Sequence, residues 1–288
     1  MRVVAFLTVV ALAGCASKSP PGVKVDASLE KLVPRDTILL AGAQWDSLLK
    51  TPLYQENFAN RQIPQIDEFA KRTGVDPRKD LSELLYASNG RGGVLLGRGK
   101  FAIQGVPRSA YKGFNFYGDD RNAVVLFSPT AAAAGDVDAL HSLIDQRGKS
   151  SGPSAALAAQ MKEIPAAAQF WAAYSGGSIH LPFDDASPLA NLNKLIASVQ
   201  TGTVYFDLRE GLNGLARADC SSDQDAEQVA GAVRALIGIG RLSVPKNHPE
   251  LAQVYDTLRV TQEARRVRLY VAVPQTMVDQ FLGMWLRR

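Results

Sequence analysis

Cysteine and histidine are scarce in this sequence of 288 residues. It contains two cysteines, Cys15 and Cys220, and three histidines, His141, His180 and His248. There is no CxxC pair, and no two histidines lie three or four positions apart, so the spacings typical of zinc proteins are missing. We therefore expect no metal site.

The common catalytic and nucleotide-binding motifs are missing too. Gly99-Lys100 invites comparison with a phosphate-binding loop, but Val94 stands where that loop needs glycine and Phe101 where it needs serine or threonine. No G-x-S-x-G segment occurs. Because catalytic triads need not be local in sequence, a hydrolase whose residues meet only in the fold stays an alternative. The sequence predicts no cofactor and favours a protein that is not an enzyme.

An excess of charge of one sign is also lacking. The 32 basic and 28 acidic residues give a net charge of +4 and are interspersed along the chain. A nucleic-acid-binding protein concentrates its basic residues in a patch or stripe. We therefore expect no nucleic-acid partner.

Long hydrophobic runs are confined to the start of the chain. Residues 1–14 combine Arg2 with the apolar stretch from Val3 to Ala11, a pattern typical of a signal peptide. This stretch is shorter than the roughly 20 residues that a membrane-spanning helix needs. The sequence predicts removal of residues 1–14 and no membrane span.

The end of this segment, Leu12-Ala13-Gly14-Cys15, resembles the lipobox of bacterial lipoproteins. The resemblance implies cleavage before Cys15, thioether lipidation of its thiol and acylation of the new N-terminus. Several acyl chains together anchor a protein stably, whereas one binds only marginally. Ala16, in place of aspartate, is typical of an outer-membrane destination. We expect a protein anchored in the outer membrane and facing the periplasm, with residues 15–29 as the lipidated cysteine and a flexible tether.

The first half of the folded body, residues 30–150, shows both helical and strand periodicity. A strand is expected over residues 37–43 and a helix from Ile63 that ends near Gly74. Two hairpins follow, with turns at residues 89–93 and 118–120, and then a helix that begins at Asp136.

The second half, residues 151–288, repeats this order of elements. We expect a strand over residues 169–174, a helix over 189–199 and a hairpin that turns at Glu210-Gly211. Ser221 and Gln224 fit a capping box at the start of the next helix, and a strand over 267–273 precedes a terminal helix. The sequence thus predicts an α+β fold of two related units, each a largely antiparallel sheet with packed helices.

Three segments carry a wider resemblance: Thr73–Phe101, with Gly-Val-Asp-Pro, a hairpin and Gly-Lys-Phe; Gly113–Gly118; and Val260–Pro274. Their pattern is similar to that of a family of internally duplicated bacterial envelope proteins of uncharacterised function. The resemblance implies the duplicated α+β architecture and an envelope location, and it carries no activity or catalytic residues.

Two sets of residues are candidates for a site. His180 lies close in sequence to Asp184 and Asp185, in a loop that either holds an ion or positions a base, or is a turn in which aspartate caps the next helix. The second set consists of aromatic residues interleaved with basic ones, which form either a binding surface or one buried face of strands; its members are Phe101, Tyr111, Phe114 and Phe116.

Taken together, these features predict a lipid-anchored envelope protein that acts in binding or assembly. Its expected partners are the membrane, through the anchor at Cys15, and an envelope protein or a saccharide.

Overall fold

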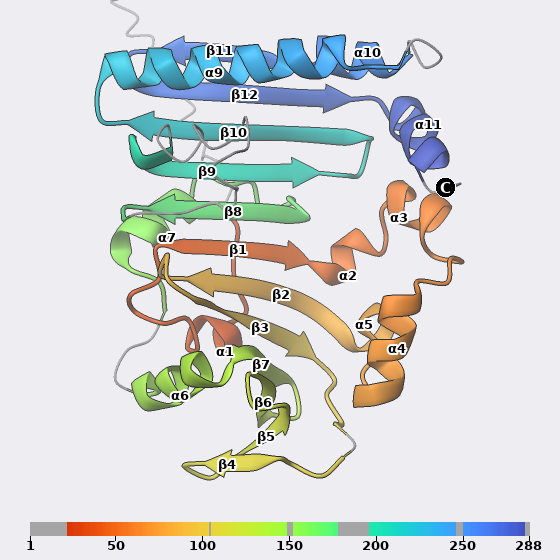
Figure 1. Ribbon diagram of the computed structural model, residues 1–288, viewed down its shortest axis with the longest axis vertical. Coiled ribbons are helices and arrows are strands. Elements are labelled where there is room, and N and C mark those ends of the chain that lie inside the picture. The colour runs from red at the N-terminus through yellow and green to blue at the C-terminus, as the bar shows by residue number, and fades with distance from the viewer. Residues whose placement is uncertain (1–21, 104, 149–151, 178–195, 246–249, 286–288) are drawn as a thin grey trace, which may run out of the picture.

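The computed structural model describes residues 22–103, 105–148, 152–177, 196–245 and 250–285. Over these residues the chain forms one antiparallel sheet of twelve strands with helices on both faces, which confirms the predicted α+β class (Figure 1). The strands are β1 Leu39–Gln44, β2 Leu81–Ser88, β3 Gly93–Gly99, β4 Ser109–Tyr111, β5 Phe114–Gly118, β6 Asn122–Ser128, β7 Ala131–Asp136, β8 Phe170–Ser175, β9 Val199–Asp207, β10 Leu212–Cys220, β11 Arg259–Glu263 and β12 Arg266–Val273.

The helices precede, connect or follow these strands. They are α1 Ala27–Glu30, α2 Trp45–Leu48, α3 Pro52–Asn57, α4 Pro64–Thr73, α5 Pro77–Asp80, α6 Val137–Gln146, α7 Ala155–Met161, α9 Asp223–Leu242, α10 Glu250–Asp256 and α11 Gln275–Trp285. None of the helices in the described ranges is both long and apolar enough to cross a membrane.

The strand order has a centre, where β1 pairs with β8. Outward from β1 the order is β2, β3, β7, β6, β5 and β4, and outward from β8 it is β9, β10, β12 and β11. Each half of the chain therefore supplies a continuous block of the sheet. In both blocks the first three strands of that half lie in chain order, and its last strand and then its second-to-last strand follow. The sequence predicts a sheet in each of two units, whereas the structure has a single sheet because the first strands of the two halves, β1 and β8, pair with each other.

The hairpins form where the sequence predicts them. Strands β2 and β3 pair around a turn in which Gly90 has a φ of 86°, a conformation that suits glycine. The side chain of Asn89 accepts hydrogen bonds from the backbone N–H groups of Arg91 and Gly92, both at 3.1 Å. Strands β5 and β6, and strands β9 and β10, form the other two expected hairpins.

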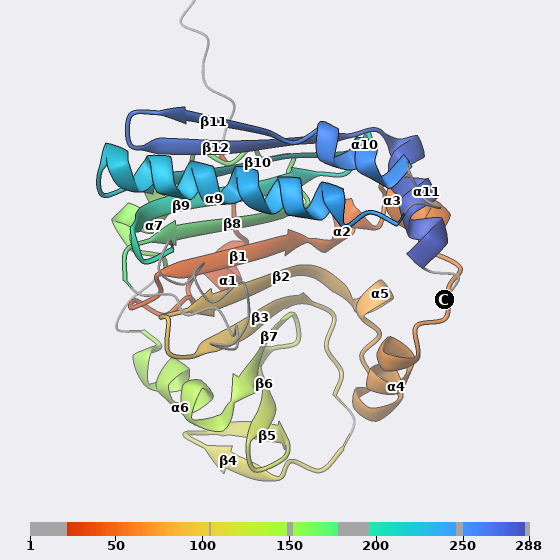
Figure 2. The same ribbon diagram turned by 45° about the horizontal axis from the view of Figure 1, so that its top comes forward.

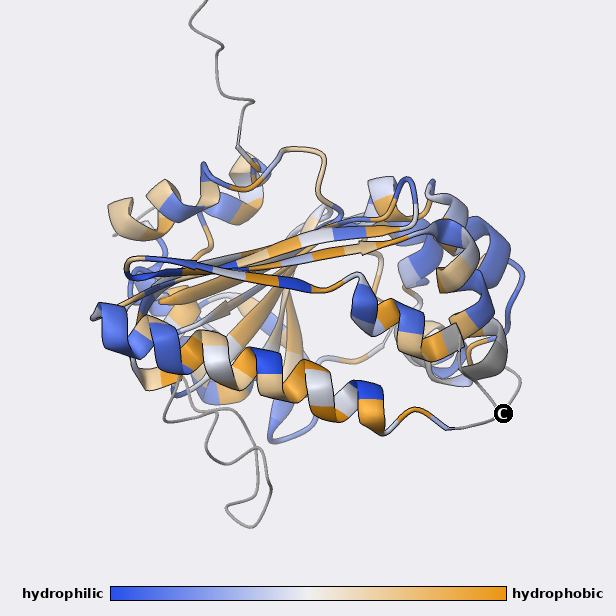
Figure 3. Ribbon diagram, turned by 90° about the horizontal axis from the view of Figure 1, so that it is seen from above, coloured by the Kyte–Doolittle hydropathy of each residue, from blue (hydrophilic) through white to orange (hydrophobic). Residues whose placement is uncertain are grey.

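The two faces of the sheet bury separate apolar clusters. On one face, α1, α6 and α7 pack their buried leucines and isoleucines against side chains such as Leu40, Leu85 and Leu96. On the other face, α9 covers β10, β11 and β12 and buries Ala226, Val229 and Ala230 beside Cys220 and Val267 (Figure 2). Figure 3 shows the sheet edge-on as a twisted, largely hydrophobic layer with helices on both sides. We call the α1/α6/α7 side the first face and the α9 side the second face.

Two local expectations need correction, and one strand was not expected. The N-cap of α9 is Ser222, whose hydroxyl accepts from the backbone N–H of Asp225, and not Ser221. Ser221 instead donates to the carbonyl of Ser198 at 3.0 Å, which joins the start of α9 to the chain before β9. The helix expected over residues 189–199 lies largely outside the described residues, and Val199 belongs to β9. The alanine run Ala131–Ala134 forms β7, a strand that the sequence did not predict.

Candidate functional site

A cavity of about 620 Å³ opens on the first face, over the strands that the second half of the chain supplies. Its floor is formed by β9, β10 and β12, and its walls come from the loop before β8, the end of α10 and the start of β11. The lining residues are Pro165, Ala167, Ala168, Tyr205, Asp207, Arg209, Asn213, Gly214, Asp256, Thr257, Arg259, Tyr270, Val271 and Ala272. The volume lies within the usual range of small-molecule sites, roughly 300–1,000 Å³.

Two tyrosines on neighbouring strands supply the aromatic part of this cavity. Both Tyr205 in β9 and Tyr270 in β12 pair with Leu215 of β10, so the alternation of side chains places both on the first face. Within the described ranges neither phenol oxygen has a hydrogen-bond partner in the protein. Burial, and then the neighbouring Tyr270 and Asp207, raise the pKa of Tyr205 above its ordinary value. Tyr205 therefore stays protonated at neutral pH and can donate a hydrogen bond to a ligand.

The charged groups of the cavity are not equally compensated. Arg209 forms an ion pair with Asp207 at 2.5 Å, and its hydrogen bonds lower the pKa of that carboxyl. Asp256 is paired with Arg241, which lies outside the cavity, at 2.8 Å. Arg259 has no carboxylate partner among the described residues, and its guanidinium lies 4.7 Å from the centre of the Tyr270 ring. The cavity thus presents one cation, Arg259, that no carboxylate neutralises.

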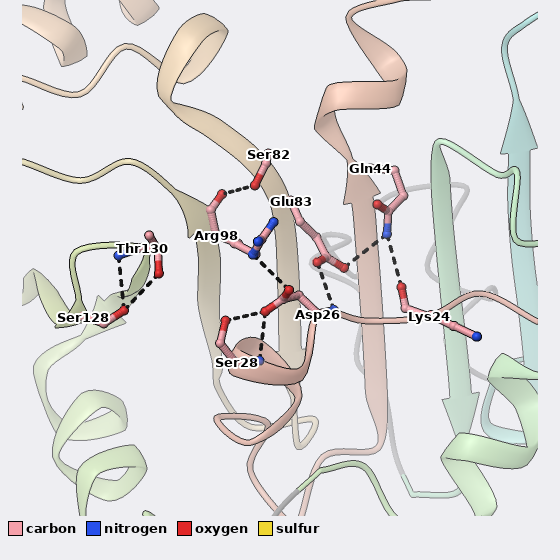
Figure 4. A network of polar contacts seen from close by, with 9 residues as sticks. All are labelled: Lys24, Asp26, Ser28, Gln44, Ser82, Glu83, Arg98, Ser128 and Thr130. Atoms are coloured by element: carbon pink, nitrogen blue, oxygen red, sulfur yellow. Dashed lines mark hydrogen bonds and ion pairs between the residues drawn. The ribbon is translucent and has the colours of Figure 1, made fainter.

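The N-terminal segment is fixed to the same face by a polar network around Glu83 (Figure 4). The Glu83 carboxylate accepts from the backbone N–H of Asp26 at 3.1 Å and from the Gln44 amide at 3.2 Å. Arg98 pairs with Asp26 at 2.9 Å, and Asp26 caps α1 by accepting from the backbone N–H of Ser28. Glu83 is only 5% exposed, and burial raises the pKa of its carboxyl. This network holds residues 24–28 against β1, β2 and β3.

The chain before this network runs beside the cavity. The backbone N–H of Val23 donates to the carbonyl of Ile164 at 2.8 Å, and Gly22 forms a bridge with Pro165. Pro165 is itself a lining residue. The first described residue therefore lies next to the cavity wall.

The aromatic residues of the second candidate set all make packing contacts. Phe116 is 1% exposed and belongs to the core, because its strand turns that side chain toward α6. Phe114 is half-buried against Phe127, with ring centres 5.2 Å apart, and Phe101 is half-buried beside Gly97. The Tyr111 ring lies 4.1 Å from that of His141. These contacts agree with the alternative in which the aromatic pattern forms a buried face of strands.

The other expected site residues fall outside the described residues. This applies to the lipidation site Cys15 and to the polar loop with His180, Asp184 and Asp185. In the part of the chain that the structure describes, no three histidine, cysteine, aspartate or glutamate side chains group as a metal site would require. Cys220 is a free thiol that is 2% exposed, and burial raises its pKa.

The cavity was missed in the sequence because its residues come from four separate stretches of the chain. A partial signal was present: Tyr205 alternates with Val204 and Phe206, and Tyr270 alternates with Leu269 and Val271. Such alternation assigns each tyrosine to the opposite side from its apolar neighbours. It does not reveal that β9 and β12 lie on either side of β10.

Comparisons with known proteins bear on the fold alone. No family model matches the sequence, and no curated protein matches it. Among solved structures, the chain is similar to crystal form III of TP0453, with a TM-score of 0.51 and 10% identity over 90% of this chain and 99% of that chain. Crystal form IV of TP0453 gives a TM-score of 0.48 at 9% identity, with 89% and 95% of the two chains covered.

Proposed function

We propose that this protein is a lipid-anchored component of the cell envelope that binds a small molecule in the cavity between β9, β10, β12 and α10. One observation carries the proposal. The cavity, of about 620 Å³, combines two phenols and an arginine that have no hydrogen-bond or ion-pair partner among the residues that the structure describes. Polar groups that converge in a concave site without partners of their own are typical of ligand binding.

Binding is favoured over hydrolysis by the residues that line the cavity. They include no histidine, cysteine or serine, the Thr257 hydroxyl donates to the carbonyl of Val254 at 2.7 Å, and each aspartate is paired with an arginine. A hydrolase needs a nucleophile within hydrogen-bond reach of a base. The lining residues offer phenols, one amide, one threonine hydroxyl and guanidinium groups, and these groups recognise a ligand through hydrogen bonds and charge.

The anchor is the second part of the proposal. Cys15 lies seven residues before Gly22, so a fully extended tether reaches about 25 Å at most. Gly22 lies beside the cavity wall at Pro165. A protein lipidated at Cys15 would therefore hold this cavity close to the membrane, on the periplasmic side of the outer membrane.

Phase partitioning tests the anchor. Membranes containing the wild-type protein or Cys15→Ala would be extracted with a phase-separating detergent. We expect the wild type in the detergent phase and the variant in the aqueous phase, since only the wild type can carry acyl chains. Equal partitioning of both would contradict lipidation at Cys15.

Ligand-observed NMR tests the cavity, with a panel of sugars, sugar acids, amino acids and nucleosides. Ala272→Trp places a large side chain at an exposed lining position, and Ala110→Trp places the same side chain on an exposed strand position at the far end of the sheet. We expect binding of at least one panel member that is lost in Ala272→Trp and kept in Ala110→Trp. Binding that is unaffected by Ala272→Trp, or no binding at all, would contradict the proposal.

We further propose that the two halves of the chain are related copies. The first five strands outward from β1 and from β8 follow the same order, which supports this, as does the pattern of elements in the sequence. Superposition of the two halves should place β1, β2 and β3 on β8, β9 and β10 in one operation. Superposition that needs a different strand order would contradict the duplication.

A further inference from the structure

The cavity's charge identifies the class of ligand that fits it. The lining contains two arginines and two aspartates, which cancel in a simple count. However, Arg241 neutralises Asp256 from outside the cavity, and Arg209 and Asp207 neutralise each other. Arg259 is left over, so the site carries a local charge of about +1 and favours an anion.

The position of Arg259 adds geometry to this charge. Its guanidinium carbon lies over the Tyr270 ring, 4.7 Å from the ring centre, and this cation–π contact leaves the guanidinium N–H groups without a carboxylate among the described residues. These N–H groups match the two oxygens of a carboxylate. The arginine is thus oriented as well as unpaired.

The tyrosines indicate which other chemical groups a ligand carries beside the carboxylate that contacts Arg259. Tyr205 and Tyr270 lie two strands apart on the same face, about 10 Å from each other at the backbone by the usual strand spacing. Between and around them the cavity offers the two phenol hydroxyls. The Asn213 amide donates to the carbonyl of Glu210 at 3.0 Å and the Thr257 hydroxyl donates to the carbonyl of Val254 at 2.7 Å, so these two side chains offer their oxygens as acceptors. A ring that carries several hydroxyl groups can accept from the phenols and donate to these oxygens, whereas a purely aliphatic body would leave the phenols without hydrogen bonds.

We infer that the cavity binds a sugar acid: a ring with hydroxyl groups that presents one carboxylate to Arg259. This inference rests on the proposed function and names its ligand class. The carboxylate lies at the edge of the guanidinium, and the ring lies against Tyr205 and Tyr270. The phenols of Tyr205 and Tyr270 donate hydrogen bonds to ring hydroxyls.

Four probes separate the charge from the ring: glucuronate has both, glucose has only the ring, acetate has only the charge, and glucosamine has the ring with the opposite charge. Calorimetric titration of the full-length protein in mild detergent would give each affinity. We expect glucuronate to bind about tenfold or more tightly than glucose and acetate. Glucosamine should be the weakest of the ring compounds.

Variants assign these preferences to residues. Arg259→Gln should weaken glucuronate binding about 10- to 100-fold and leave glucose unchanged. Arg259→Lys keeps the positive charge but loses the planar guanidinium. Its affinity for glucuronate should lie between that of the wild type and that of Arg259→Gln. Tyr270→Leu should weaken both glucuronate and glucose. Arg108→Gln, which removes an exposed arginine paired with Asp120 near β4, is the matched control and should change nothing.

The possible failures can be distinguished. If neutral and acidic sugars bind equally and Arg259→Gln has no effect, the sugar-acid inference is wrong while ligand binding in the cavity stands. The same holds if another compound of the NMR panel binds in a manner sensitive to Ala272→Trp and glucuronate does not bind. If no compound of the NMR panel binds the wild type and loses that binding in Ala272→Trp, both the proposed function and the sugar-acid inference are wrong.

Discussion

The contact between Gly42 and Trp171 lies at the centre of the sheet, where the two halves of the chain meet. Gly42 of β1 is paired with Trp171 of β8, and the indole covers the glycine on the first face. A Cβ atom built on Gly42 would lie 2.3 Å from Cε2 of Trp171, and Trp171 is only 3% exposed. Gly42→Ala therefore forces the indole or the two central strands to move.

The expected cost follows from this overlap. Overpacking of a filled core by one methyl group usually costs about 1–3 kcal/mol. For a chain of this size each kcal/mol lowers the melting temperature by about 2–4 °C, so a decrease of roughly 2–12 °C is expected. Chemical denaturation with urea, followed by tryptophan fluorescence and circular dichroism, measures the free energy of unfolding directly.

Gly92→Ala is the matched control, because a Cβ atom at Gly92 would meet no atom within 4 Å. Its effect should stay within about 0.5 kcal/mol. Trp171→Leu removes the indole, so adding Gly42→Ala to that variant should cost less than in the wild type, and a double-mutant cycle gives the difference. If Gly42→Ala is no more destabilising than Gly92→Ala, or if its cost is the same with and without Trp171, the assigned packing is wrong.

Three further predictions concern buried polar groups. Gln169→Leu should lower the free energy of unfolding in urea by about 1–3 kcal/mol. Gln169 is fully buried and its side-chain oxygen accepts from the backbone N–H of Leu208 at 2.6 Å, so the substitution leaves that N–H without an acceptor. A cost near zero would contradict this. Burial raises the pKa of Glu83 above 4.5, so its contribution to stability is greatest below that pH and is lost as pH rises through the shifted pKa. The unfolding free energy of the wild type relative to Glu83→Gln should therefore fall as pH rises from about 4.5, and a difference that rises with pH would refute the environment assigned to Glu83. Cys220 should react slowly with a thiol reagent in the native protein and fully in denaturant, because it is buried with a raised pKa; rapid native labelling would show a reactive thiol.

The sequence determined those elements whose signals are local. The Asn89–Gly93 turn fixes the hairpin of β2 and β3 because asparagine and glycine accept positive φ angles. Gly74 ends α4 in the left-handed conformation, with a φ of 74°, and Asp136 caps α6, both as the sequence predicts. Alternation in β9, β10 and β12 likewise appears in the sequence, since one side of each strand faces α9 or the core. In each case the residues that determine the element lie within a few positions of it.

Tertiary structure decided the features that depend on distant neighbours. Alanine favours helices, yet Ala131–Ala134 lie in β7 because β3 and β6 pair with this strand on both sides. Ala131 and Ala133 are almost fully buried there. Phe116 is a core residue because α6 packs over its strand. The cavity exists because β10 places Tyr205 and Tyr270, 65 positions apart in the sequence, on one face of the sheet. Periodicity states which side of a strand a residue occupies, but strand order, which long-range hydrogen bonding sets, decides which residues share that side.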